Sequence, residues 1–97
     1  MTRELNSLLA RLEDVVERMP DCFNTYEFAQ KLALQYQPEF FAAGHSLAEH
    51  EGKVLRVLHQ KIAEALAGSE MVIEGALLPC VTPWGETATS PRWHRKH

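Results

Sequence analysis

Residues 53–67 read KVLRVLHQKIAEALA, and this stretch decides the fold class. Its apolar side chains recur at helical spacing and fall on one side of a helix; they are Val54, Leu58, Ile62, Ala65 and Leu66. Gly68 follows, and glycine is the residue that most often ends a helix. The pattern predicts an amphipathic helix over 53–67 with one face buried in a core.

Two further helical segments precede this stretch. The spacing of Asn24 and Glu27 is that of a capping box, which predicts a helix from Thr25 to Pro38. The same proline can open a short helix through Phe40 and Phe41, because proline suits the first turn. Gly44 is expected to close that helix. Ser46 and Glu49 repeat the capping-box spacing ahead of residues 53–67.

The first twenty residues carry the longest apolar stripe at helical spacing: Leu5, Leu8, Leu9, Leu12, Val15, Val16 and Met19. The stripe predicts one helix that begins near Thr2 and ends before Pro20. It is wide enough to line a core, and its heptad-like spacing would also suit a seam between two chains. We favour the core.

The pattern changes after Gly68. Met71, Val72 and Ile73 are typical strand residues, whereas the prolines between 79 and 91 remove backbone donors. We therefore expect two short strands around an irregular loop, and a frayed basic tail over 92–97. The predicted fold is a single, mainly helical α+β domain over 1–97, in which three to four helices precede a short, irregular two-stranded β element.

Composition excludes several classes of protein. With 97 residues, 45% apolar and 24% charged, the chain has the balance of one globular domain rather than of a disordered segment. It contains neither an apolar run of membrane-spanning length nor the apolar region of a signal peptide, so we expect a cytoplasmic protein. Cys22 and Cys80 lack CxxC spacing and are interpreted as free thiols, with a disulfide as the alternative.

Charge is unevenly distributed in this acidic chain, whose net charge is -3. Residues 52–97 hold six bases and four acids, and no acid interrupts 52–63. Lys53, Arg56 and Gln60 share a helix face, with Lys61 at its margin. Such cations bind phosphates, and arginine or glutamine can hydrogen-bond base edges. This predicts a nucleic-acid-binding face, with an ordinary solvated helix face as the alternative.

The order of elements over residues 22–97 resembles a winged helix-turn-helix domain. Three helices precede a pair of strands punctuated by proline and glycine, and the chain then ends in the basic segment 92–96. The segments 23–33 and 54–66 are also similar to small bacterial proteins of that fold class. The resemblance implies binding of double-stranded DNA, with the third helix in the groove. It also implies contacts to the flanking backbone from Arg92, Arg95 and Lys96.

The alternative function is a protein-interaction or homodimerisation module without catalytic activity. It would use the first helix or a surface formed by Phe40, Phe41 and Trp84. We expect no enzyme, because no catalytic motif occurs. We expect no metal and no cofactor, because His50 and His59 are nine positions apart and fall on opposite sides of a helix.

Overall fold

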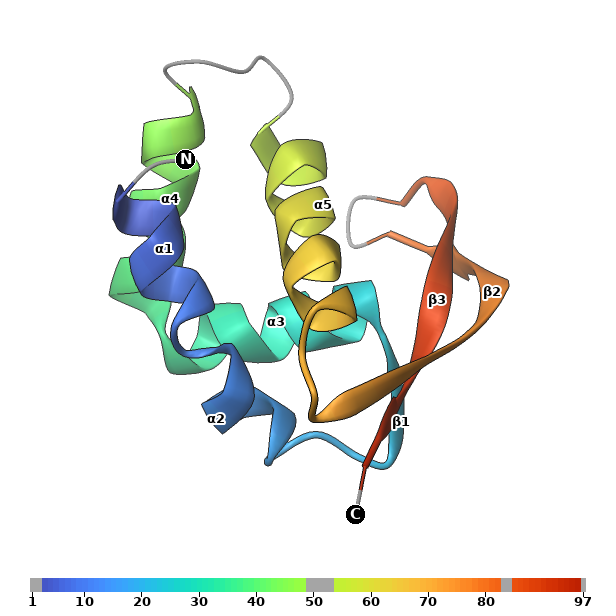
Figure 1. The fold of residues 1–97 in the computed structure, drawn as a ribbon. Coiled ribbons are helices and arrows are strands. Elements are labelled where there is room, and N and C mark those ends of the chain that lie inside the picture. The colour runs from blue at the N-terminus through green and yellow to red at the C-terminus, as the bar shows by residue number, and fades with distance from the viewer. Residues whose placement is uncertain (1–2, 49–53, 83–84, 97) are drawn as a thin grey trace.

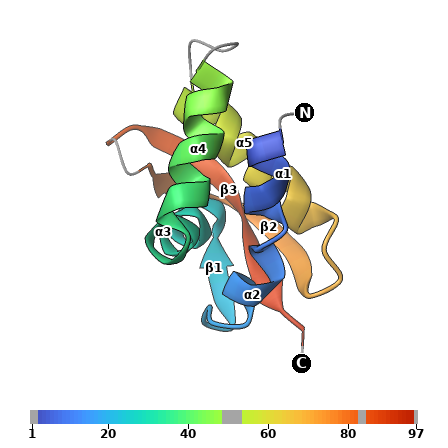
Figure 2. The ribbon, with the colours of Figure 1, turned by 90° about the vertical axis from the view of Figure 1, so that its left-hand side faces the viewer.

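The computed structural model describes residues 3–48, 54–82 and 85–96 and has a mixed α+β fold (Figure 1). Its helices are α1 Arg3–Leu9, α2 Leu12–Val16, α3 Thr25–Gln35, α4 Gln37–Ala48 and α5 Val54–Ala67. Its strands are β1 Cys22–Asn24, β2 Val72–Val81 and β3 Thr87–Arg95. Figures 1 and 2 show α1 and α4 on one side of α5 and the β2–β3 hairpin on the other.

The first apolar stripe lines the core, as predicted, but the prediction of one continuous helix is wrong. The chain turns at Ala10 and Arg11, where the Arg11 amide donates to Leu8 O, three residues back, over 3.0 Å. This tighter turn separates α1 from α2. It lets both short helices face the core, and the buried residues are Leu5, Leu8, Leu12, Val15, Val16 and Met19. The chain's own core therefore uses this stripe.

The capping box at the start of α3 is confirmed. The Glu27 amide donates to Asn24 Oδ1 over 2.8 Å, and the Asn24 amide donates to Glu27 Oε1 over 2.9 Å. Helix α4 begins directly after α3, with Pro38 in its first turn as expected. It does not end at Gly44. Ser46 lies inside α4 rather than at the start of a helix, while Glu49 lies outside the described residues.

The β element is a three-stranded antiparallel sheet of order β1-β3-β2, rather than a short two-stranded one. The register accommodates Pro79 and Pro91. Thr82 N donates to Glu86 O over 2.8 Å, so these two residues form a hydrogen-bonded pair across the hairpin. In an antiparallel sheet, such pairs alternate with pairs whose backbone donors point away from the partner strand. Pro79–Thr89 and Leu77–Pro91 are pairs of the second kind. The hairpin therefore forms without the donors that Pro79 and Pro91 lack.

The frayed basic tail is also a wrong prediction for residues 92–95, which form the end of the central strand β3. Trp93 is 1% exposed and pairs in register with Phe23 of β1. The Arg95 amide donates to Asp21 O, and the Lys96 amide donates to Met71 O, each over 2.9 Å. These two hydrogen bonds attach the end of β3 to the residues just before β1 and just before β2.

Two further properties follow from the described residues. Cys22 on β1 and Cys80 on β2 are free thiols, in agreement with the favoured interpretation. Within the described ranges, no helix has both the length and the apolar character that a membrane crossing requires.

Candidate functional site

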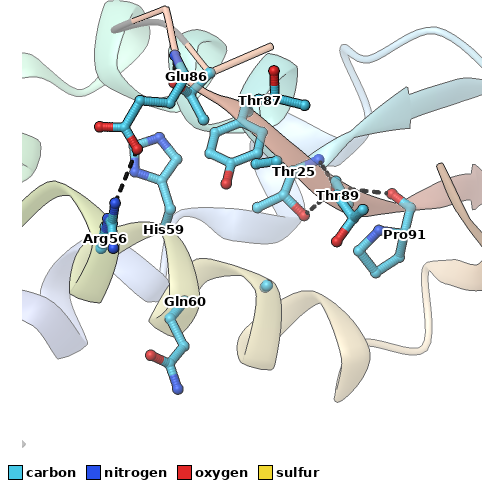
Figure 3. A pocket seen from close by; sticks show the side chains of 13 residues that line it. Thr25, Arg56, His59, Gln60, Glu86, Thr87, Thr89 and Pro91 are labelled. Atoms are coloured by element: carbon cyan, nitrogen blue, oxygen red, sulfur yellow. Dashed lines mark hydrogen bonds and ion pairs between the residues drawn. The ribbon is translucent and has the colours of Figure 1, made fainter. Parts of the chain in front are cut away.

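A cavity of about 410 Å³ lies between α5 and β3, beside the first turn of α3 (Figure 3). Helix α5 contributes Arg56, His59 and Gln60, and β3 contributes residues 87–91. Thr25, Thr82 and Ser90 are buried polar residues of its lining. Two of the residues that the sequence singled out, Arg56 and Gln60, therefore lie together at a hollow that many polar side chains line.

The inner wall of the cavity is fixed by hydrogen bonds around Thr25. Thr25 Oγ1 accepts from Trp93 Nε1 over 2.9 Å and lies 3.0 Å from Ser90 Oγ. The Thr25 amide donates to Ser90 Oγ over 3.0 Å, and that hydroxyl can also donate to Pro91 O. These bonds tie β3 to the start of α3, so this wall is rigid.

The floor of the cavity carries two aromatic rings. Tyr26 and His59 lie with their ring centroids 5.1 Å apart, and His59 is buried. Burial raises the pKa of Tyr26, Cys80 and Glu86 raise it further, and Arg56 lowers it. The Tyr26 phenol therefore stays protonated and can donate a hydrogen bond at neutral pH.

At the mouth of the cavity, Arg56 Nη2 lies 2.9 Å from Glu86 Oε2 (Figure 3). Backbone bonds position Glu86: its amide donates to Thr82 Oγ1 over 3.0 Å and its carbonyl accepts from Thr82 N. Gly85 precedes it with φ of +86°, a conformation that glycine adopts readily. The acid is thus held over α5 by the local turn. The two side chains remain 58% and 54% exposed.

The structure does not bring the predicted nucleic-acid-binding residues into one basic face. Arg56 is paired with Glu86, and Lys61 lies 3.7 Å from Glu64, while Gln60 hydrogen-bonds the same glutamate. Lys53 lies outside the described residues. The free basic strip expected on α5 is therefore absent from the part of this helix that is described.

The second predicted basic group lies elsewhere. Arg92 and Arg95 occupy the far end of β3 and Lys96 follows it, about 20–30 Å of strand away from Glu86, the partner of Arg56. Arg92 Nε donates to Cys22 Sγ over 2.8 Å, and Arg95 Nη1 donates to Met19 O over 2.8 Å. Arg95 thus acts in holding the fold.

An exposed apolar surface on β2 was missed by the sequence analysis. Leu77 and Val81 are 66% and 68% exposed and, with the exposed Pro79, alternate along the strand and therefore share one face of the hairpin. We call these three residues the β2 stripe. Ile73 and Leu78 are also exposed on the same strand. The uncharged run over 75–82 was the available signal, but the prolines led us to expect a loop.

The aromatic surface that the sequence predicted on Phe40, Phe41 and Trp84 is only partly in place. Phe40 packs against the core, whereas Phe41 is exposed. Trp84 lies outside the described residues. Among the described residues, the β2 stripe is therefore a larger exposed apolar surface than Phe41 alone.

Among the described residues, no group of three histidine, cysteine or acidic side chains is placed to hold a metal ion. Comparison with protein-family models, with curated protein sequences and with solved structures found no match for the chain.

Proposed function

We propose that this protein is a self-associating interaction module, in which two copies pack through the β2 stripe. The observation that carries the proposal is the exposure of Leu77 and Val81 on one face of an edge strand. Contiguous exposed apolar side chains commonly mark interaction sites, and edge strands that remain uncovered tend to associate.

Charge permits a second copy as the partner at the hairpin. Each chain carries a net charge of -3, so two copies repel each other over most orientations. The hairpin is the exception, because residues 75–82 and 87–91 contain no charged side chain. Two copies related by a twofold axis can therefore bring their stripes together without opposing like charges.

The stripe supports a weak dimer. Full burial of a leucine or valine side chain contributes about 1.5–3 kcal/mol, and roughly two thirds of each is available here. Two such side chains from each copy give about 4–8 kcal/mol, which association costs of similar size offset. Pro79 lacks a backbone donor, so hydrogen bonding between the two edge strands adds little.

Sedimentation equilibrium over about a hundredfold range of concentration tests this proposal. We expect a reversible monomer–dimer equilibrium that Leu77→Lys or Val81→Lys shifts to monomer. Leu34→Lys is the matched control, because Leu34 is 70% exposed on α3, away from the hairpin. A strictly monomeric wild-type protein, or a Leu77→Lys variant that dimerises as well as Leu34→Lys, would refute it.

We propose binding of double-stranded DNA, in the manner of a winged helix, as the second candidate function. The order β1, α3, α4, α5 and then a β2–β3 hairpin, with β1 beside β3, resembles the order of elements in that class, and this supports the proposal. Exposed Arg56 and Gln60 on α5 also support it. The pairing of Arg56 with Glu86 weakens it.

Fluorescence anisotropy of a labelled DNA duplex, measured with the protein at low and at high salt, tests this second candidate function. If α5 contacts phosphates, binding weakens steeply with salt, Arg56→Glu abolishes it, and Glu86→Gln strengthens it by freeing Arg56. Arg3→Gln, on the distant α1, is the control. Equal binding by Arg56→Glu and Arg3→Gln would refute a role for α5.

A further inference from the structure

The cavity between α5 and β3 has a lining that suits a particular class of ligand. Six of its side chains carry hydroxyl groups: Thr25, Tyr26, Thr82, Thr87, Thr89 and Ser90. The cavity's volume of about 410 Å³ is within the usual range of small-molecule sites. Its few apolar members are small, because Ala63, Ala88 and Pro91 supply them. The hollow is therefore suited to a small, polar molecule.

The charged side chains of the lining restrict further the class of ligand that the cavity can bind. Arg56 and Glu86 are its cation and its carboxylate, and they face each other at the mouth from different segments of the chain (Figure 3). A simple anion would have to displace Glu86, and a simple cation would have to displace Arg56. A molecule that carries both charges can satisfy both groups at once.

The two charged groups are available for such an exchange. Their side chains are more than half exposed, and exposed ion pairs contribute little to stability, so parting them costs the fold little. The bonds to Thr82 fix the backbone of Glu86, so its carboxylate remains within side-chain reach of the mouth when Arg56 moves. Arginine can hold a carboxylate through two parallel N–H donors.

We propose that this cavity binds a free α-amino acid, with its carboxylate on Arg56 and its ammonium group on Glu86. The rest of the ligand then lies in the hollow between α5 and β3. The proposal does not rest on self-association, because Leu77, Pro79 and Val81 of the β2 stripe are not part of the cavity lining.

Thermal-shift measurements, followed by calorimetric titration, test the proposal with each proteinogenic L-amino acid as probe. We expect at least one to raise the melting temperature in a saturable way, because a ligand that binds only the folded state stabilises it. The N-acetyl derivative of that amino acid lacks the ammonium group, and its amide lacks the carboxylate. Each should bind about tenfold more weakly or not at all.

Variants of the ion pair provide the second part of the test. Arg56→Gln and Glu86→Gln should each weaken binding by about tenfold or more, with little change in the melting temperature of the ligand-free protein. Lys61→Gln is the matched control, because it alters a comparable exposed pair on α5 outside the cavity lining. No stabilisation by any amino acid, equal binding of the amide, or undiminished binding by Glu86→Gln would each overturn the proposal.

Discussion

Replacement of Thr25 by valine tests the hydrogen-bond network that joins β3 to α3. Valine keeps the shape of threonine but removes the acceptor of the Trp93 indole N–H, which is buried. The Ser90 hydroxyl can turn to Pro91 O, 3.0 Å away, so the indole donor is the group left without a partner. An unsatisfied buried donor costs about 1–3 kcal/mol, or about 4–8 °C of melting temperature for each kcal/mol in a domain of this size.

Chemical denaturation of Thr25→Val, Trp93→Phe and the double variant measures this effect. Because Trp93→Phe removes the orphaned donor, Thr25→Val should cost about 1 kcal/mol less in that background. Thr89→Val, on the exposed part of β3, is the control and should change stability by no more than about 0.5 kcal/mol. A Thr25→Val protein as stable as the wild type, or equal costs in both backgrounds, would refute the role assigned to this bond.

Two further perturbations have definite outcomes. Gly75→Ala should lower the free energy of unfolding by about 1–3 kcal/mol, since a Cβ there would lie 2.7 Å from Arg92 O, whereas Gly68→Ala, with 3.7 Å of clearance, should be tolerated in the same thermal melts. The hydrogen bond from Tyr36 to Asp14 raises the pKa of Tyr36, so its stabilisation is complete below about pH 10 and is lost as pH rises through the raised pKa. Denaturation midpoints of Tyr36→Phe should therefore fall less steeply above that pH than those of the wild type; parallel curves would contradict this account.

Local sequence signals predicted the elements that local interactions determine. Helix α5 follows its apolar spacing to within one residue, and the Asn24 capping box fixes the start of α3. The burial of the N-terminal stripe was also predictable, because its period requires a partner surface. Only the turn at Ala10 and Arg11 interrupts the expected helix, and no proline or glycine marks it.

The parts that sequence reasoning missed depend on distant pairing. Strand β1 is three residues long, and its partner residues in β3 are about seventy positions away. The prolines favoured a loop, yet the register of Pro79 and Pro91 in the hairpin makes their missing donors harmless. In the cavity, Arg56 and Gln60 were identified from α5 alone, whereas Glu86 joins them from thirty residues further along the chain.

The position of β3 in the sheet has a consequence for the order of folding. β1 and β2 are both bonded to β3 and not adjacent to each other in the sheet, although both precede β3 in the chain. As synthesis proceeds from the N-terminus, the helices can form early, but neither outer strand can pair until residues 87–95 have left the ribosome. The apolar surface of β2 is thus synthesised before the strand that will hold it in place, so nascent chains halted before Thr87 should be especially prone to aggregate.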